Sequence, residues 1–309
     1  MAERMAERMN KRSEKQAAGY FNNRTAAANS GFTIIEMLIA MAVSALVVAA
    51  IYVLFVSQQR HYMAQSQVVE MQQNLRSGTG MMESDLRMVG YSPVATPTDT
   101  FGLRDIRKMD LAYLPNTTGN SSIQFSVDLD EDGELDILTE VITYSLANYP
   151  DNNAALQDGV ADLTRCTQTT VMPASPNFNR QLIAENIQAL GIAYAFDLDG
   201  DDKLDTSAKG NVIWAVDTNN DNVLDKLLDT DDDGDIDVND TAGGAALGSA
   251  PALSHIRSAR VWVLARSGEV DPGFSGAVTY VIAERRIVTA DNFRRRVLEF
   301  TMYFRNAGL

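Results

Sequence analysis

Gly31-Phe32-Thr33-Ile34-Ile35-Glu36 is the stretch on which the fold of this chain depends, together with the apolar run of residues 37–56 that follows it. The run holds twenty residues, of which Ser44 is the one clearly polar member. A transmembrane helix needs about 20 apolar residues to cross a hydrocarbon core of roughly 30 Å. The sequence therefore predicts one membrane-spanning helix with the carboxylate of Glu36 at its N-terminal end. A lone charge in a membrane is costly and marks function, so we expect Glu36 to have a partner from elsewhere.

A polar leader, residues 1–31, precedes the span. Its basic residues outnumber its acidic residues by six to three: Arg4, Arg8, Lys11, Arg12, Lys15 and Arg24 against Glu3, Glu7 and Glu14. This excess predicts a cytoplasmic N-terminus, with the rest of the chain on the other side of the membrane. An ordinary secretory signal has an apolar core of about 7–15 residues and a small-residue cleavage site after it. Here the core is longer and the small residue, Gly31, stands before it.

The remainder of the chain is acidic. The whole chain carries a net charge of −15 and the leader +3, so residues 32–309 carry −18. Such a surface repels nucleic-acid phosphates, so no nucleic-acid partner is expected, but it is compatible with cation binding. The single cysteine, Cys166, excludes an intrachain disulfide; it is expected to be buried, the alternative being a bond to another chain. No enzyme is expected, because the sequence has no nucleophile elbow, zinc-binding histidine pair or phosphate-binding glycine loop.

The pattern of apolar residues predicts an α+β fold. Apolar side chains from Val68 to Val89 recur at helical spacing, which continues the first helix to about residue 90. A loop is expected over residues 91–120, with one turn of structure at 103–109. Alternating residues then predict strands of a mainly antiparallel sheet, at 123–127, 138–146, 190–196, 212–216, 261–264, 278–283 and 296–305. The expected parts are a leader (1–31), a transmembrane and stalk helix (32–90) and a β-rich head (91–309).

Four Asp-rich segments, here called the first to fourth acidic loops, repeat one spacing with carboxylate or amide side chains at positions 1, 3, 5 and 9. They are Asp128, Asp130, Asp132 and Asp136; Asp197, Asp199, Asp201 and Asp205; Asp217, Asn219, Asp221 and Asp225; and Asp229, Asp231, Asp233 and Asp237, with Asp240 at position 12 of the fourth.

This spacing is typical of calcium-binding loops. Calcium takes 6–8 oxygen ligands, and alternate carboxylates on a tight turn converge on one point. Position 6 is Gly133 or Gly234 in the first and fourth loops, where a left-handed backbone is tolerated. The usual bidentate Glu at position 12 is missing from all four loops. We therefore expect one to four weak calcium sites, strongest in the first and fourth loops; the alternative is a set of solvated acidic turns.

The residues around Gly31 resemble the type IV prepilin signal, in which Gly is followed by Phe, by Glu as the fifth residue, and by a long apolar helix. Gly31, Phe32, Thr33 and Glu36 all match that pattern. The resemblance implies that a prepilin peptidase cuts between Gly31 and Phe32 and methylates the new amine. It also implies that Glu36 of one subunit pairs with the Phe32 amine of a neighbour.

Four further segments resemble PilW-type minor pilins: residues 71–77, 82–91, 256–267 and 294–306. The stretch 198–252, with its acidic insertions, departs from that family. The resemblance implies a pilin-like fold and a minor pilin that helps initiate type IV pilus assembly at the inner membrane and then joins the pilus, with other major and minor pilins as partners through its N-terminal helix. Two alternatives remain open, a minor pseudopilin of type II secretion and a calcium-dependent adhesin or ligand-binding module at a filament tip.

Overall fold

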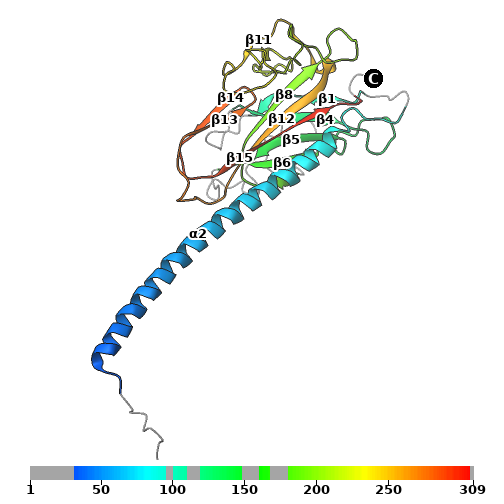
Figure 1. Cartoon of the computed structure of the whole chain (residues 1–309). Coiled ribbons are helices and arrows are strands. Elements are labelled where there is room, and N and C mark those ends of the chain that lie inside the picture. Colours follow the sequence, from blue (N-terminus) through cyan, green and yellow to red (C-terminus); the bar gives the residue numbers. More distant parts are fainter. Residues whose placement is uncertain (1–30, 95–99, 110–118, 148–159, 168–179, 307–309) are drawn as a thin grey trace, which may run out of the picture. The chain divides into compact units, whose positions relative to one another are not determined.

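The computed structural model describes residues 31–94, 100–109, 119–147, 160–167 and 180–306 (Figure 1). The predicted leader up to residue 30 lies outside the described residues. The chain divides into two compact units, Met1–Arg60 and His61–Leu309, which are described in turn.

The first unit contains the beginning of helix α2 (Ile34–Leu86). Its apolar side chains are exposed on all sides of the helix, with Ile34 at 82% and Leu46 at 72%. Among the described residues α2 is the one helix long and apolar enough to cross a membrane, and its most apolar window has no buried residue. The predicted span thus has the expected length and position in the chain.

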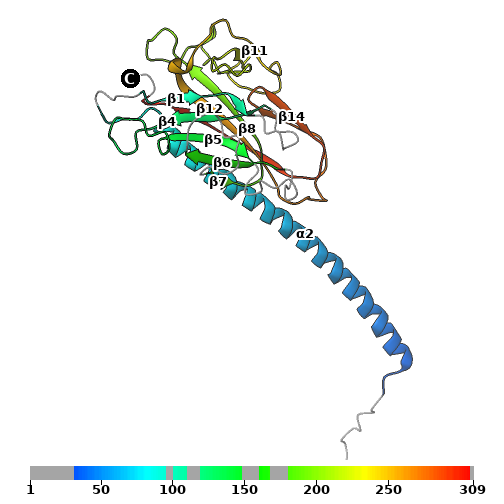
Figure 2. The same ribbon diagram turned by 180° about the vertical axis from the view of Figure 1, so that it is seen from behind.

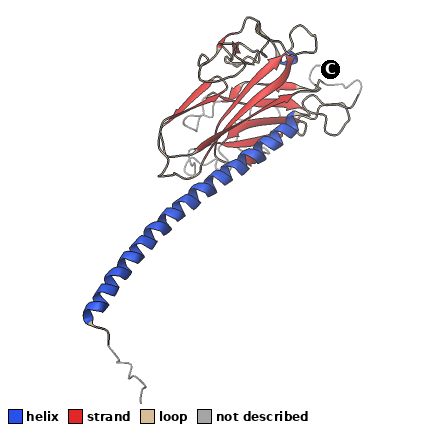
Figure 3. Ribbon diagram, viewed as in Figure 1, coloured by secondary structure: helices blue, strands red, loops and turns tan. Residues whose placement is uncertain are grey.

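The second unit combines the end of α2 with antiparallel strands, as Figure 3 shows. Its described elements after α2 are β1 (Leu103–Asp105), β2 (Lys108–Met109), β3 (Asn120–Ser121), β4 (Ile123–Ser126), β5 (Val141–Ala147), β6 (Asp162–Thr167), β7 (Arg180–Ala184), β8 (Ile187–Phe196), β9 (Ala215–Val216), β10 (Lys226–Leu227), β11 (Ala245–Ala246), the 3-10 helix η1 (Leu253–His255), β12 (Ile256–Arg266), β13 (Val278–Ile282), β14 (Arg285–Thr289) and β15 (Arg295–Tyr303).

The strands form two main sheets, one with the order β1-β4-β5-β6-β7 and one with the order β11-β10-β9-β8-β12-β15. Two hairpin-like pairs, β13-β14 and β2-β3, accompany them. The longest pairing is β8 with β12, in which Val261 lies opposite Ile192 and, on its other side, opposite Phe300 of β15. All pairings between the described strands are antiparallel, so the predicted fold class, a long helix followed by antiparallel sheet, is confirmed.

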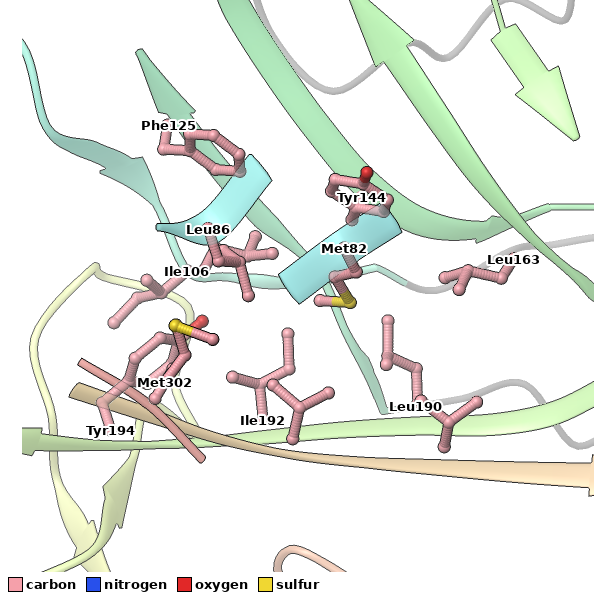
Figure 4. Close-up of a cluster of buried hydrophobic side chains, with 14 of the residues drawn as sticks. Met82, Leu86, Ile106, Phe125, Tyr144, Leu163, Leu190, Ile192, Tyr194 and Met302 are labelled. Carbon is pink, nitrogen blue, oxygen red and sulfur yellow. The ribbon is translucent and has the colours of Figure 1, made fainter. Parts of the chain in front are cut away.

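The end of α2 lies in the hydrophobic core between the two sheets (Figure 4). Met82 and Leu86 are fully buried, with Tyr144 of the five-stranded sheet on one side and Ile192 of the six-stranded sheet on the other. Tyr194 is buried in the same cluster. The helical spacing of apolar residues predicted from the sequence therefore marks the face of α2 that the head buries.

Gly78 allows α2 to approach the five-stranded sheet closely. A Cβ atom at this position would lie 2.9 Å from the Cβ of Ala184 and 3.3 Å from Cδ2 of Leu163, which is too near for an ordinary contact. Figure 2 shows this part of α2 passing β6 and β7, the strands that carry these residues. The helix continues without interruption through Gly78, although glycine is a poor helix former. Close packing explains the glycine here.

Several details of the predicted secondary structure were wrong. The expected loop over residues 91–120 contains β1, β2 and the start of β3, and the strand expected from residue 138 begins at Val141. Leu138 is 57% exposed in a turn, because the Asp136 carboxylate accepts bonds from the Leu138 amide and the Thr139 hydroxyl. β6, β7 and β14 were not predicted. Cys166 is buried on β6, as expected.

Candidate functional site

The residues at the start of α2 form a reciprocal cap. The Thr33 amide donates to Oε2 of Glu36 at 3.0 Å, and the Glu36 amide donates to the hydroxyl of Thr33 at 3.2 Å. The Thr33 hydroxyl donates to the same Glu36 oxygen at 3.0 Å. This is a capping box, in which Thr and Glu satisfy each other's free backbone amides at a helix start. The Thr-x-x-Glu pattern before an apolar run is its sequence signature, so this cap was predictable from the sequence although it was not predicted.

Gly31 and Phe32 precede this cap and are not packed against other residues in the described part of the chain. Phe32 is 87% exposed, and a Cβ atom at Gly31 would have no heavy atom within 4 Å. The fold therefore does not require glycine at position 31. A requirement for glycine there, if experiment finds one, would come from another molecule that contacts this backbone.

The four acidic loops share one backbone conformation. In each, the buried position-1 aspartate accepts a hydrogen bond from the amide of position 6, and the position-5 carboxylate accepts one from the amide of position 7. The first set of bonds runs from Gly133 to Asp128, Asp202 to Asp197, Asn222 to Asp217 and Gly234 to Asp229, at 2.8–3.1 Å. The second runs from Glu134 to Asp132, Lys203 to Asp201, Val223 to Asp221 and Asp235 to Asp233, at 2.8–2.9 Å.

Two positions in every acidic loop have positive φ angles. Position 6, predicted from the sequence to be left-handed, has φ between 64° and 95°, and position 4 has φ between 58° and 74°. These residues are, for position 6, Gly133, Asp202, Asn222 and Gly234, and for position 4, Glu131, Gly200, Asn220 and Asp232. Aspartate and asparagine tolerate this region better than most side chains. The weaker second and third loops thus adopt the same turn as the first and fourth.

The loops differ in the acid that closes them. In the second loop, Oδ2 of Asp205 at position 9 accepts a hydrogen bond of 3.2 Å from the position-2 amide. In the third loop, Asp225 at position 9 accepts the corresponding bond at 2.7 Å. In the first loop Glu140, at position 13, takes this place, accepting the Leu129 amide at 2.6 Å. In the fourth loop Asp240, at position 12, accepts the Thr230 amide at 2.5 Å. The first and fourth loops are therefore longer and closed by a buried acid.

In each of three loops, three carboxylates lie close enough together to hold one metal ion, with ligand oxygens within 4.8 Å of one another. The groups are Asp128, Asp130 and Glu140; Asp197, Asp199 and Asp205; and Asp229, Asp231 and Asp240. The other predicted ligands of these loops lie outside the groups, namely Asp132, Asp136, Asp201, Asp233 and Asp237. Among the described residues the third loop, with Asp217, Asn219, Asp221 and Asp225, gives no such group.

Glu140 is the ligand candidate that the sequence analysis missed. It stands one residue beyond position 12, where a bidentate Glu was sought and Thr139 was found. One signal in the sequence could have identified it: Glu140 stands directly before the apolar residues of β5, where a buried residue is expected. The structure corrects the first loop in this respect, because a glutamate closes it after all.

Crowding of carboxylates affects their protonation. Partial loss of solvation raises the pKa of Asp130 above its usual value, and the negative charges of Asp132 and Glu140 add to the effect. The same causes raise the pKa of Asp231, where the added charges include those of Asp233 and Asp240. A bound cation would remove this repulsion, since an opposite charge favours the ionised carboxylate. These loops thus have the donor atoms and the electrostatics of a site for a hard cation.

Comparison with known proteins gave two results. Residues 27–52 match a family model described as the prokaryotic N-terminal methylation motif, so the chain carries that motif at Gly31 and in the first part of the span. Among solved structures, a type IV-like pilin from Thermus thermophilus is similar at 15% identity over 77% of this chain and 97% of that chain, with a TM-score of 0.39. The search of curated proteins gave no match.

Proposed function

We propose that this chain is a membrane-anchored minor pilin that takes part in assembling a type IV pilus. A prepilin peptidase would cut it between Gly31 and Phe32 and methylate the new amine, leaving α2 as anchor and as the contact to other pilins. The observation that carries the proposal is the methylation motif at residues 27–52, placed directly at the start of a helix long and apolar enough to span a membrane. The head would then face the periplasm before the subunit enters the filament.

The exposure of the first part of α2 supports an assembly role. A helix that is apolar all round is normally buried in protein or lipid, yet the side chains here are exposed, with Ile34 at 82% and Val53 at 67%. Lipid covers such a surface in the membrane, and neighbouring helices would cover it in a filament. Glu36 is the one acid at the start of this helix, so a neighbour's amine is the counter-charge that we propose for it.

Replacing Glu36 by alanine is expected to leave cleavage and membrane insertion intact but to reduce incorporation into filaments strongly. The physical reason is the lost counter-charge, which leaves the neighbour's amine unpaired. An unpaired charge costs about 2.5–3.5 kcal/mol at the membrane centre on insertion scales, and this value is the upper bound for a charge at the start of the span. The measurement is the amount of the mature chain in sheared filaments, compared with its amount in the membrane.

The capping box offers a control for this experiment. Glu36→Gln keeps an oxygen that can accept the Thr33 amide but has no charge. If Glu36 acts as a counter-charge, both Glu36→Ala and Glu36→Gln lose incorporation. Normal incorporation of Glu36→Gln would show that capping of α2, and not charge pairing, is the role of this residue.

We also propose that the head binds calcium through the acidic loops, most strongly through the first and fourth. Support comes from the carboxylate groups around Asp128 and Asp229 and from the loop conformation that all four segments share. The sequence has no histidine or cysteine in these loops, so the donors are oxygens, which calcium prefers.

A type II secretion pseudopilin would share the methylation motif and α2; filament fractions from pilus and secretion mutants would separate the two functions.

Calcium is expected to raise the unfolding temperature of the full chain in detergent. With sites of about 10⁻⁴–10⁻³ M, an ion concentration of a hundred times Kd stabilises the folded state by about 2.7 kcal/mol per site. The measurement is thermal unfolding in calcium and in chelator. Asp231→Ala should remove part of the difference, while Asp235→Ala, which removes an exposed charge of the same loop, should not. Equal unfolding temperatures with and without calcium would leave these loops as solvated acidic turns.

A further inference from the structure

We propose that the first acidic loop is a calcium site closed by Glu140, and that the bound ion fastens the segment after α2 to the five-stranded sheet. This inference rests on the proposed calcium binding and adds to it a ligand and a structural role. It is carried by a buried oxygen without a partner, by buried acids without a basic partner, and by the contacts that this loop makes with residues 90–94.

The first observation is the carboxylate of Asp128. The residue is 1% exposed, and its Oδ1 atom is buried with no hydrogen-bond donor. Its other oxygen accepts the Ser92 hydroxyl at 2.7 Å and the Gly133 amide at 3.1 Å. Buried polar atoms nearly always have a partner, and a bound ion is one explanation for an exception. The group formed with Asp130 and Glu140 places Asp128 where a cation would supply that partner.

The second observation is Glu140, which is also 1% exposed. Its Oε1 accepts the amides of Leu129 and Asp130 at 2.6 and 3.3 Å, and its Oε2 accepts the Asp136 amide at 2.9 Å. Three backbone amides thus hold the carboxylate in place with both oxygens inside the loop. In known calcium loops, a glutamate at the end of the loop binds the ion with both oxygens. In this loop, Glu140 is the glutamate that backbone amides hold in position to bind an ion.

The third observation is the absence of a basic partner. Among the described residues, no ion pair involves Asp128, Asp130 or Glu140. Two other buried acids of the head do have such partners: Arg165 bonds Asp85, and Arg107 bonds Asp105. Buried charge without a counter-charge is strongly unfavourable. Two buried acids beside a third carboxylate therefore call for a cation from solution.

The first loop lies against the chain that leaves α2. The Asp128 amide donates to the Tyr91 carbonyl at 2.9 Å, and the Gly90 amide donates to the Ser126 carbonyl at 3.1 Å. The Ser92 hydroxyl binds the Asp128 carboxylate itself. A Cβ atom at Gly133 would lie 3.1 Å from Val94. An ion that fixes Asp128 therefore also fixes residues 90–94, directly after the buried end of the helix.

The test is calcium binding and hydrogen exchange of the full chain in detergent, comparing wild type with Glu140→Gln. The matched control is Glu134→Gln, which removes one exposed charge from the same loop. Wild type and Glu134→Gln are expected to bind the same number of calcium ions, and Glu140→Gln one fewer. Calcium should slow exchange in peptides covering residues 88–94 and 126–134 in wild type and Glu134→Gln, but not in Glu140→Gln. Peptides from the fourth loop should respond to calcium in all three.

The possible failures can be told apart. If wild type binds no calcium, the calcium proposal fails together with this inference. If Glu140→Gln binds as many ions as wild type, the assignment of Glu140 is wrong while calcium binding stands. Ser92→Ala removes a link but no ligand, so it should keep the full number of ions while exchange in residues 88–94 becomes faster. Exchange in residues 88–94 of wild type that is equally fast with calcium and with chelator would overturn the fastening role, even if Glu140→Gln does not fold.

Discussion

Replacing Asp85 by alanine is expected to destabilise the head by about 3–5 kcal/mol, the range found when one partner of a buried ion pair is removed. Nε of Arg165 donates to Oδ2 of Asp85 at 2.6 Å, and the hydroxyl of Tyr144 donates to the same oxygen at 2.8 Å. Burial, reinforced by the negative charge of Asp85, raises the pKa of Tyr144 far above its usual value, so the phenol remains a donor. Alanine would leave a partly buried guanidinium and a buried hydroxyl without their acceptor.

Denaturant unfolding of the full chain in detergent measures this effect, followed by the fluorescence of Trp214 and Trp262, which are both buried in the head. Glu83→Ala is the matched control on the same helix, because its ion pair with Arg87 is largely exposed and worth at most about 1 kcal/mol. Adding Arg165→Met to Asp85→Ala removes the unpaired charge. The double variant should therefore lose less unfolding free energy than the two single variants lose in sum. A loss below about 1 kcal/mol for Asp85→Ala contradicts this account.

Gly31→Leu is expected to abolish maturation while the folded head forms normally. The described part of the fold leaves open space around Gly31, so a leucine there disturbs no contact within it. A peptidase that cuts after this residue must approach the backbone closely, and we expect a large side chain to prevent that approach. Mass spectrometry of the chain from a host with a prepilin peptidase should find a product starting at Phe32 for wild type and the uncut chain for Gly31→Leu.

Gly80→Leu serves as the control for this experiment, since Gly80 is also exposed and a Cβ atom there meets nothing within 4 Å. It should mature like wild type. A wild-type product that starts elsewhere than at Phe32, or normal maturation of Gly31→Leu, would refute the proposed processing.

Local patterns predicted the parts of the fold whose form depends on nearby residues. The apolar run after Glu36 predicted the first helix, and the spacing of Met71, Leu75 and Met82 predicted its buried face, because helical periodicity is written directly into the sequence. The acidic loops were predictable for the same reason: Asp, Asn and Gly at fixed offsets favour the turn that all four adopt.

Features that depend on distant residues were not predictable in this way. β6 reads as a mixed segment because Asp162 and Thr164 are polar, yet both are buried: Thr164 donates to the Ser145 carbonyl, and Asp162 accepts the Asn186 amide. Strand pairing satisfies these groups, and a single sequence does not show that pairing. Glu140 was missed because a loop with one extra residue places its closing acid outside the twelve-residue pattern.

The burial of the end of α2 between the sheets has a consequence for limited proteolysis. Met71, Leu75, Met82 and Leu86 supply core side chains to the head, so these helical residues belong to the smallest folded fragment that contains the sheets. A protease cut within residues 61–70 would release a fragment with its core complete. A cut just before the first strand would expose the facing apolar surfaces of two sheets, and that fragment would aggregate. The soluble part of this molecule thus begins inside a helix.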